Sequence, residues 1–213
     1  MEPTPSAPVF RVNGGRVAVL ADVQSLFYAA KNAQQSKVEY GRMLAGVVGN
    51  RLVTRAIAYV VQREQLSSGF CEALSRFGYD IRLKSLPART EGENQPKWSW
   101  AAGICVDAMT LAPRVDSIVI ATADGTLLPL VESLVGVGCR VEIAGVERGT
   151  PSELIQSASA FIPIRQDWMF KEPKFTSTET PIRRNPRYEG LPDDAELDME
   201  AEALANRQHG TGN

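Results

Sequence analysis

The sequence predicts an α/β protein whose mostly parallel sheet is flanked by helices, a Rossmann-like arrangement. Apolar, β-branched runs alternate with helical patterns along residues 16–168. This alternation is typical of a parallel sheet with helices on both faces. With 213 residues and 44% hydrophobic side chains, the chain has enough apolar material for one packed domain of this kind and a tail.

The predicted elements follow one another in a regular order. Apolar runs predict strands at 17–21, 56–61, 79–83, 117–121, 140–144 and 160–164. Amphipathic patterns predict helices at 23–33, 37–51, 65–77, 98–111, 127–137 and 151–158. Gly78 and Gly138 are expected to end the helices before them, because glycine is favoured just past a helix C-terminus. The polar segment 87–97 predicts a loop.

The two ends of the chain differ in composition from the predicted domain, 16–168. Three prolines and a Gly-Gly pair predict a disordered arm over residues 1–15. Residues 169–213 predict a flexible tail that is first basic and then acidic, since segment 189–202 has seven acids and no base. A thin apolar stripe within 193–207 predicts a short acidic helix, which would be marginal alone in water.

Composition excludes several classes of function. The single histidine, His209, lies in a Gly-rich terminus. The core therefore has no histidine to act as the base of a Ser-His-Asp mechanism or as the ligand of a His-containing zinc site. The three cysteines are far apart and predict reduced thiols. The sequence has neither a membrane-length apolar run nor a signal peptide pattern. We therefore expect a cytoplasmic protein with no membrane partner.

Two predicted strands end in an aspartate. Strand 17–21 leads into Asp22, and strand 117–121 leads through Thr122 and Ala123 into Asp124. Ligands of open α/β sheets gather at the carboxyl ends of the strands, so these two carboxylates suggest one shared acidic site. A purely structural interpretation stays open, because Asp is also a favoured N-cap of the helix that follows.

Four segments resemble the NYN domains, which are PIN-like, and the LabA/DUF88 group most of all. The segments are Asp22 to Tyr28, Lys97 to Asp107, Thr122 to Leu130 and Ser152 to Ile164. The resemblance covers about residues 16–168 and implies the architecture of a metal-dependent RNA nuclease. In that family, acids at the carboxyl edge of the sheet hold Mg²⁺ or Mn²⁺. It implies that Asp22, Asp124 and Asp107 are catalytic positions, and that Asp22 and Asp124 ligate the metal.

The sequence departs from the family pattern at several of these positions. Ser25 replaces the Asn of the first motif. Ala101 and Thr126 replace two expected acids. A two-metal site needs carboxylates around both ions, whereas Mg²⁺ alone keeps several waters and needs only one or two. We therefore expect an RNA-binding domain with a depleted metal site and weak or lost ribonuclease activity. An active ribonuclease with a single Mg²⁺ is the first alternative.

The remaining candidate residues concern nucleic acid and partners. Lys97 and Trp98 belong to a dense aromatic-basic cluster that suits unpaired bases of single-stranded RNA, although a tryptophan in the core or against the loop is the competing interpretation. Ser25, Thr122 and Thr126 offer hydroxyls to phosphate beside the acids. The second alternative is a non-catalytic scaffold, in which the fold serves a homodimer or the tail binds a protein partner.

Overall fold

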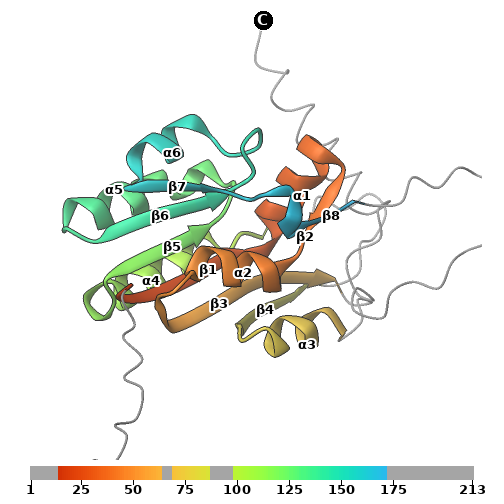
Figure 1. The fold of residues 1–213 in the computed structure, drawn as a ribbon, viewed down its shortest axis with the longest axis horizontal. Helices are drawn as coiled ribbons and strands as arrows, with labels where there is room; N and C mark the ends of the chain where they lie inside the picture. Colours follow the sequence, from red (N-terminus) through yellow and green to blue (C-terminus); the bar gives the residue numbers. More distant parts are fainter. Residues whose placement is uncertain (1–13, 64–68, 87–97, 172–213) are drawn as a thin grey trace, which may run out of the picture.

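The structure, a computed structural model, describes residues 14–63, 69–86 and 98–171 and contains a six-stranded, all-parallel sheet. The strands are β1 (Arg16–Asp22), β3 (Leu52–Arg63), β4 (Asp80–Leu86), β5 (Ser117–Ala121), β6 (Arg140–Gly145) and β7 (Ala160–Pro163). Their order across the sheet is β4-β3-β1-β5-β6-β7 (Figure 1). The predicted α/β class with a parallel sheet is confirmed.

Helices cover both faces of this sheet. One face carries α1 (Val23–Gln34), α2 (Tyr40–Val48) and α3 (Gly69–Arg76), and the other carries α4 (Ala101–Leu111), α5 (Leu128–Gly136) and α6 (Ser152–Ser157). Figure 1 shows α1 and α2 in front of the central strands and α4 behind them. Short 3-10 turns are η1 (Ala112–Arg114), η2 (Gly125–Leu127) and η3 (Gln166–Trp168).

The sheet divides the apolar interior into two cores. Alternate residues of β1 belong to different cores, with Val19 facing α1 and α2 and Leu20 facing α4 and α5. Both central strands are buried on both faces, as expected for a parallel sheet, and this explains their continuous apolar sequences. Gly78 and Gly138 have positive φ after α3 and α5, so the predicted helix ends are confirmed.

A second, two-stranded antiparallel sheet was not predicted. It pairs β2 (Ser36–Val38) with β8 (Met169–Lys171). The helix predicted at 37–51 is therefore wrong at its start, since α2 begins only at Tyr40. The buried carboxylate of Glu39 caps it by accepting hydrogen bonds from the backbone N–H groups of Gly41 and Arg42. The described chain also continues past 168, where the domain was predicted to end.

The start of α4 and the extent of β3 also differ from the predictions. The helix predicted from Trp98 begins at Ala101, where the backbone N–H donates to the Ser99 hydroxyl at 3.1 Å. Strand β3 is longer than the predicted 56–61 because it pairs with β1 from Leu52 onward. Residues 1–13 and 172–213 lie outside the described part, as do 64–68 and 87–97, so most of the predicted arm, the tail and the 193–207 helix are not tested.

Candidate functional site

The two predicted aspartates lie at the carboxyl ends of adjacent strands. Asp22 is the last residue of β1 and the N-cap of α1, and Asp124 is the N-cap of η2 just past β5. Strands β1 and β5 are paired up to Ala21 and Ala121, which delivers both loops to one edge. The expected capping is observed: the Asp22 Oδ1 accepts from the N–H of Ser25 at 3.3 Å, and the Asp124 Oδ1 accepts from the N–H of Thr126 at 2.9 Å. The shared acidic site at this edge stays a prediction.

One buried hydroxyl connects the two aspartates. The Thr122 side chain is fully buried, and its Oγ1 donates to Asp22 Oδ2 at 3.3 Å. The same Oγ1 accepts from the backbone N–H of Asp124 at 3.0 Å. Thr122 therefore fixes the relative position of the two acidic loops, and its burial favours a positioning role over direct contact with a ligand.

Ser25 completes this hydroxyl network. Its Oγ lies 3.0 Å from Thr122 Oγ1, 3.3 Å from the Asp22 carbonyl oxygen, and it accepts from the backbone N–H of Ala123 at 3.1 Å. A hydroxyl at this position thus joins the start of α1 to the β5 loop. Because the network uses both Asp22 oxygens, it competes with any ligand for that carboxylate.

Burial raises the pKa of the Asp22 carboxyl above its ordinary value, and the nearby Asp124 carboxylate raises it further. Hydrogen bonds from Ser25 and Thr122 act in the opposite direction but do not cancel the effect. Only 8% of Asp22 is exposed. Two neighbouring carboxylates at a buried edge therefore carry an unfavourable negative charge, which a bound cation would relieve.

This raised pKa predicts how stability depends on pH in the presence of a chelator. Above the folded-state pKa, ionised Asp22 costs stability. This cost shrinks as pH falls below that pKa and is gone below the lower pKa of the unfolded chain. Asp22→Asn keeps an N-cap and removes the charge, so we expect a higher free energy of unfolding at neutral pH and a shrinking gain toward acid. Urea unfolding across this range measures it, with the exposed Glu147→Gln as a control that leaves the profile unchanged. A loss of stability at neutral pH would show that the ionised cap supports the fold.

Asp107 is held by partners of its own. Its Oδ2 accepts from the Tyr59 hydroxyl at 2.8 Å, and Arg82 forms an ion pair with it at 3.3 Å. Burial and the Asp107 carboxylate both raise the pKa of Tyr59, which stays a protonated donor. Tyr59 is the register partner of Asp22, so Asp107 is one strand away from the acidic pair. Its predicted catalytic role stays a prediction.

Positions 101 and 126, where acids were expected, lie on elements that contact each other. Ala101 is the first residue of α4 and packs against the core, and α4 contacts η2, where Thr126 is exposed. Trp98 is 42% exposed. Lys97 lies outside the described residues. Tyr59, Arg82 and Lys84 were missed, although Arg82 and Lys84 have the two-residue spacing that places side chains on one face of a strand.

The donor atoms at the carboxyl edge of the sheet determine which metal ions it can bind. Within 14–63, 69–86 and 98–171, no cluster of three or more Asp, Glu, His or Cys side chains is placed to bind a metal. Asp22 and Asp124 with their neighbouring hydroxyls are hard oxygen donors, which fit one hydrated Mg²⁺ or Mn²⁺. They do not supply enough carboxylates to bind two metal ions.

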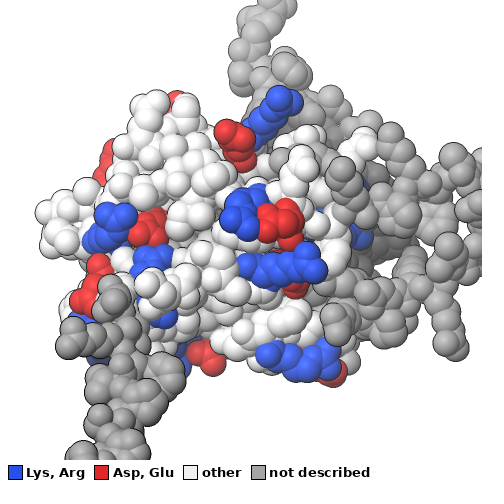
Figure 2. Space-filling view, in the orientation of Figure 1, with Lys and Arg blue, Asp and Glu red and all other residues white. Residues whose placement is uncertain are grey.

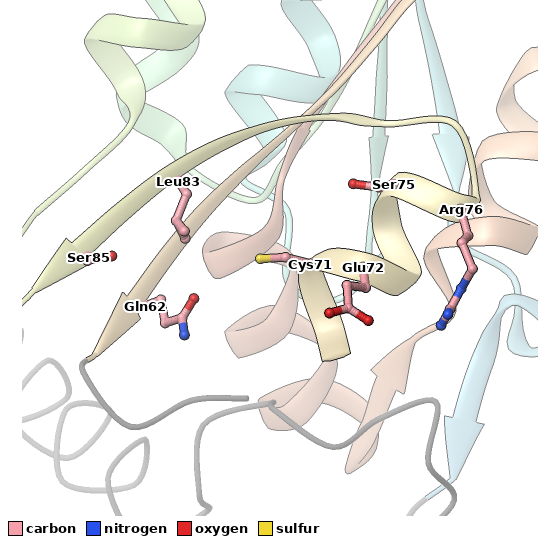
Figure 3. A pocket seen from close by; sticks show the side chains of 7 residues that line it. All are labelled: Gln62, Cys71, Glu72, Ser75, Arg76, Leu83 and Ser85. Atoms are coloured by element: carbon pink, nitrogen blue, oxygen red, sulfur yellow. The ribbon is translucent and has the colours of Figure 1, made fainter. Parts of the chain in front are cut away.

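The remaining surfaces of the described chain fit a ligand less well. On the face with α1 and α2, Figure 2 shows basic and acidic side chains side by side, and Arg42 and Arg165 there pair with Glu39 and Asp167. An open cleft of about 680 Å³ lies between α3 and the ends of β3 and β4 (Figure 3). Its lining includes Glu72 and Arg76 but none of the predicted site residues.

Comparisons with known proteins address the whole domain. The family model described as NYN domain matches residues 16–165. A crystal structure of a protein of unknown function, VPA0982 from Vibrio parahaemolyticus RIMD 2210633, is similar with a TM-score of 0.63 and 28% identity; the match covers 73% of this chain and 96% of that one. No curated protein matches the sequence. In the described part of the chain, no helix is long and apolar enough to span a membrane.

Proposed function

This chain belongs to the NYN domain family, and on that premise we propose that it binds single-stranded RNA at the carboxyl edge of its sheet with weak or lost ribonuclease activity. The family is RNase-like and PIN-related, typically metal-dependent, and its substrates are RNA. The observation that carries the proposal is the pair Asp22 and Asp124, tied together by Thr122 where a fuller acidic cluster is expected.

Ala101 and Thr126 support the loss of activity. A methyl group at 101 cannot ligate a metal, and Thr126 donates its backbone N–H to Asp124 in a cap. Asp22 and Asp124 would hold a single ion, and a bound Mg²⁺ or Mn²⁺ would supply charge stabilisation to a phosphodiester. The hydroxyls of Ser25 and Thr122 orient Asp22, and burial keeps water from its inner side.

Restoring the two acids tests this proposal. We expect the wild-type protein to bind single-stranded RNA with an affinity that falls steeply with salt, and to cleave it slowly or not at all in Mg²⁺ or Mn²⁺. The variant Ala101→Asp/Thr126→Asp should bind Mn²⁺ at least about tenfold more tightly, because affinity rises with the charge of the ligand set. Calorimetry measures the metal, and a labelled oligoribonucleotide measures binding and cleavage.

The matched control moves one acid by a single residue. Ala102→Asp/Thr126→Asp places a carboxylate on an exposed position of α4 and should gain less metal affinity than the Ala101 variant. Equal gains in the two variants would show that position 101 does not face the site. An absence of RNA binding by the wild-type protein would overturn the proposal itself.

A second candidate, an active ribonuclease with one metal ion, is favoured by the coupling between Asp22 and Asp124. It requires wild-type cleavage that depends on Mg²⁺ or Mn²⁺ and disappears in Asp124→Asn. The same labelled oligonucleotide distinguishes the two candidates by rate: an active single-metal site in the wild-type protein cleaves it as fast as the variant Ala101→Asp/Thr126→Asp does, whereas a depleted site cleaves it more slowly or not at all.

A further inference from the structure

Within the described residues, an exposed tryptophan and a lysine without a carboxylate partner meet next to the acidic edge. Trp98 is 42% exposed, and the Lys84 ammonium lies 4.5 Å from the centroid of its ring. Within the described residues Lys84 has no carboxylate partner, whereas its neighbour on the same face of β4, Arg82, pairs with Asp107. Lys84 is therefore a cation whose charge is available to an anionic ligand.

The ring of Trp98 packs on a row of aromatic side chains that is hydrogen-bonded to the sheet. It contacts Trp100 edge-on at 6.2 Å between centroids, and Trp100 lies 5.7 Å from Tyr59. The Trp100 indole N–H donates to the Val60 carbonyl oxygen at 3.0 Å, which ties this aromatic row to β3. The hydroxyl of Tyr59 donates to Asp107 at 2.8 Å. Trp98 is thus an exposed ring on a fixed base, and little conformational freedom is lost when a ligand stacks on it.

The position of this row connects it to the candidate site. Tyr59 of β3 is the register partner of Asp22 of β1, so the row begins one strand from the acidic pair and extends toward β4. From β4 to β5 there are three strand spacings, about 14 Å. A ligand that contacts Lys84 and Asp124 together must therefore be longer than one nucleotide.

We propose that Trp98 and Lys84 form a subsite for one unpaired nucleobase of a bound RNA strand; this inference rests on the proposed function. The base takes the place of the ammonium over the Trp98 ring, and the long Lys84 side chain moves to the adjacent phosphate. The magnitudes favour this exchange. An exposed cation–π contact is worth about 0.5–1 kcal/mol, whereas a base stacked on an aromatic side chain is worth about 1–3 kcal/mol.

The test measures the affinity of a labelled single-stranded oligoribonucleotide for the full chain. Trp98→Ala should weaken binding by roughly 5- to 150-fold. Trp98→Phe should recover part of the loss, because it keeps a ring. Lys84→Gln should reduce the slope of log affinity against log salt by about 0.7, as expected for one phosphate contact on a single strand.

Two controls separate the subsite from general effects. Arg114→Gln removes an exposed cation in η1, before the amino end of β5, and should leave the slope unchanged. Duplex RNA keeps its bases stacked within the helix, so Trp98→Ala should leave duplex affinity unchanged. Equal losses for duplex and single strand, or wild-type affinity in Trp98→Ala, would overturn the subsite while RNA binding stands. Wild-type protein that binds no RNA contradicts the proposed function instead.

Discussion

Glu142→Gln is expected to lower the free energy of unfolding by roughly 3–5 kcal/mol, because it breaks a buried ion pair and leaves Arg51 without its counter-charge. The Glu142 side chain is 8% exposed and that of Arg51 is 16% exposed, with 2.9 Å between Oε2 and Nη1. Arg51 also donates to the Ser117 hydroxyl at 3.0 Å and to the Val48 carbonyl oxygen at 3.2 Å. The pair thus joins the end of α2 to β5 and β6. Urea unfolding of the full chain measures the loss.

The matched comparison is the exposed pair between Arg55 and Asp80, whose side chains are 51% and 54% exposed. Asp80→Asn should change the free energy of unfolding by less than about 1 kcal/mol, since water screens exposed pairs. The double variant Arg51→Met/Glu142→Gln should be less destabilised than the sum of Arg51→Met and Glu142→Gln, because it leaves neither charge of this pair buried and unpaired. If Glu142→Gln and Asp80→Asn have similar small effects, the buried pair contributes no more than a surface pair.

Local sequence patterns were enough to predict most strands of the six-stranded sheet. Strand β5 has the bounds predicted from its apolar run, 117–121, because a strand buried on both faces has to be apolar throughout. Segment 36–38 has no such signal. It is a strand because its backbone pairs with Met169–Lys171, far along the chain. The local sequence gives no information about such a distant partner. The predicted helix started too early, at residue 37, because the apolar period of α2 was extended beyond its actual N-cap, Glu39.

In the candidate site, too, some features could be predicted from local sequence and others could not. Asp22 and Asp124 could be predicted because each follows its own buried strand. The contact of Asp107 with Tyr59 and Arg82 could not, since it depends on the register of β3 against β4 and on where α4 lies. The bridging position of Thr122 likewise needs the pairing of β1 with β5. Residues on one element can be read from a pattern, whereas contacts between elements require the fold.

The close packing of α2 against η3 predicts a large effect for a single methyl group. Gly46 lies in α2 directly against the indole ring of Trp168, and a Cβ at this position would overlap that ring. Trp168 is 7% exposed and belongs to the core beneath α2. Because the ring cannot move without disturbing β8, which follows it, Gly46→Ala should lower the free energy of unfolding by roughly 1–3 kcal/mol or more.

The same substitution at Gly136 should have the opposite sign. Gly136 is the last residue of α5, its φ is not positive, and a Cβ there meets no atom within 4 Å. Gly136→Ala should therefore stabilise by up to about 1 kcal/mol through helix propensity alone. Since propensity also favours alanine at 46, any loss there measures the overlap with Trp168. A smaller loss for Gly46→Ala in a Trp168→Phe background would assign it to the indole ring, whereas equal gains at both glycines would mean that α2 and Trp168 are packed less closely than the structure places them.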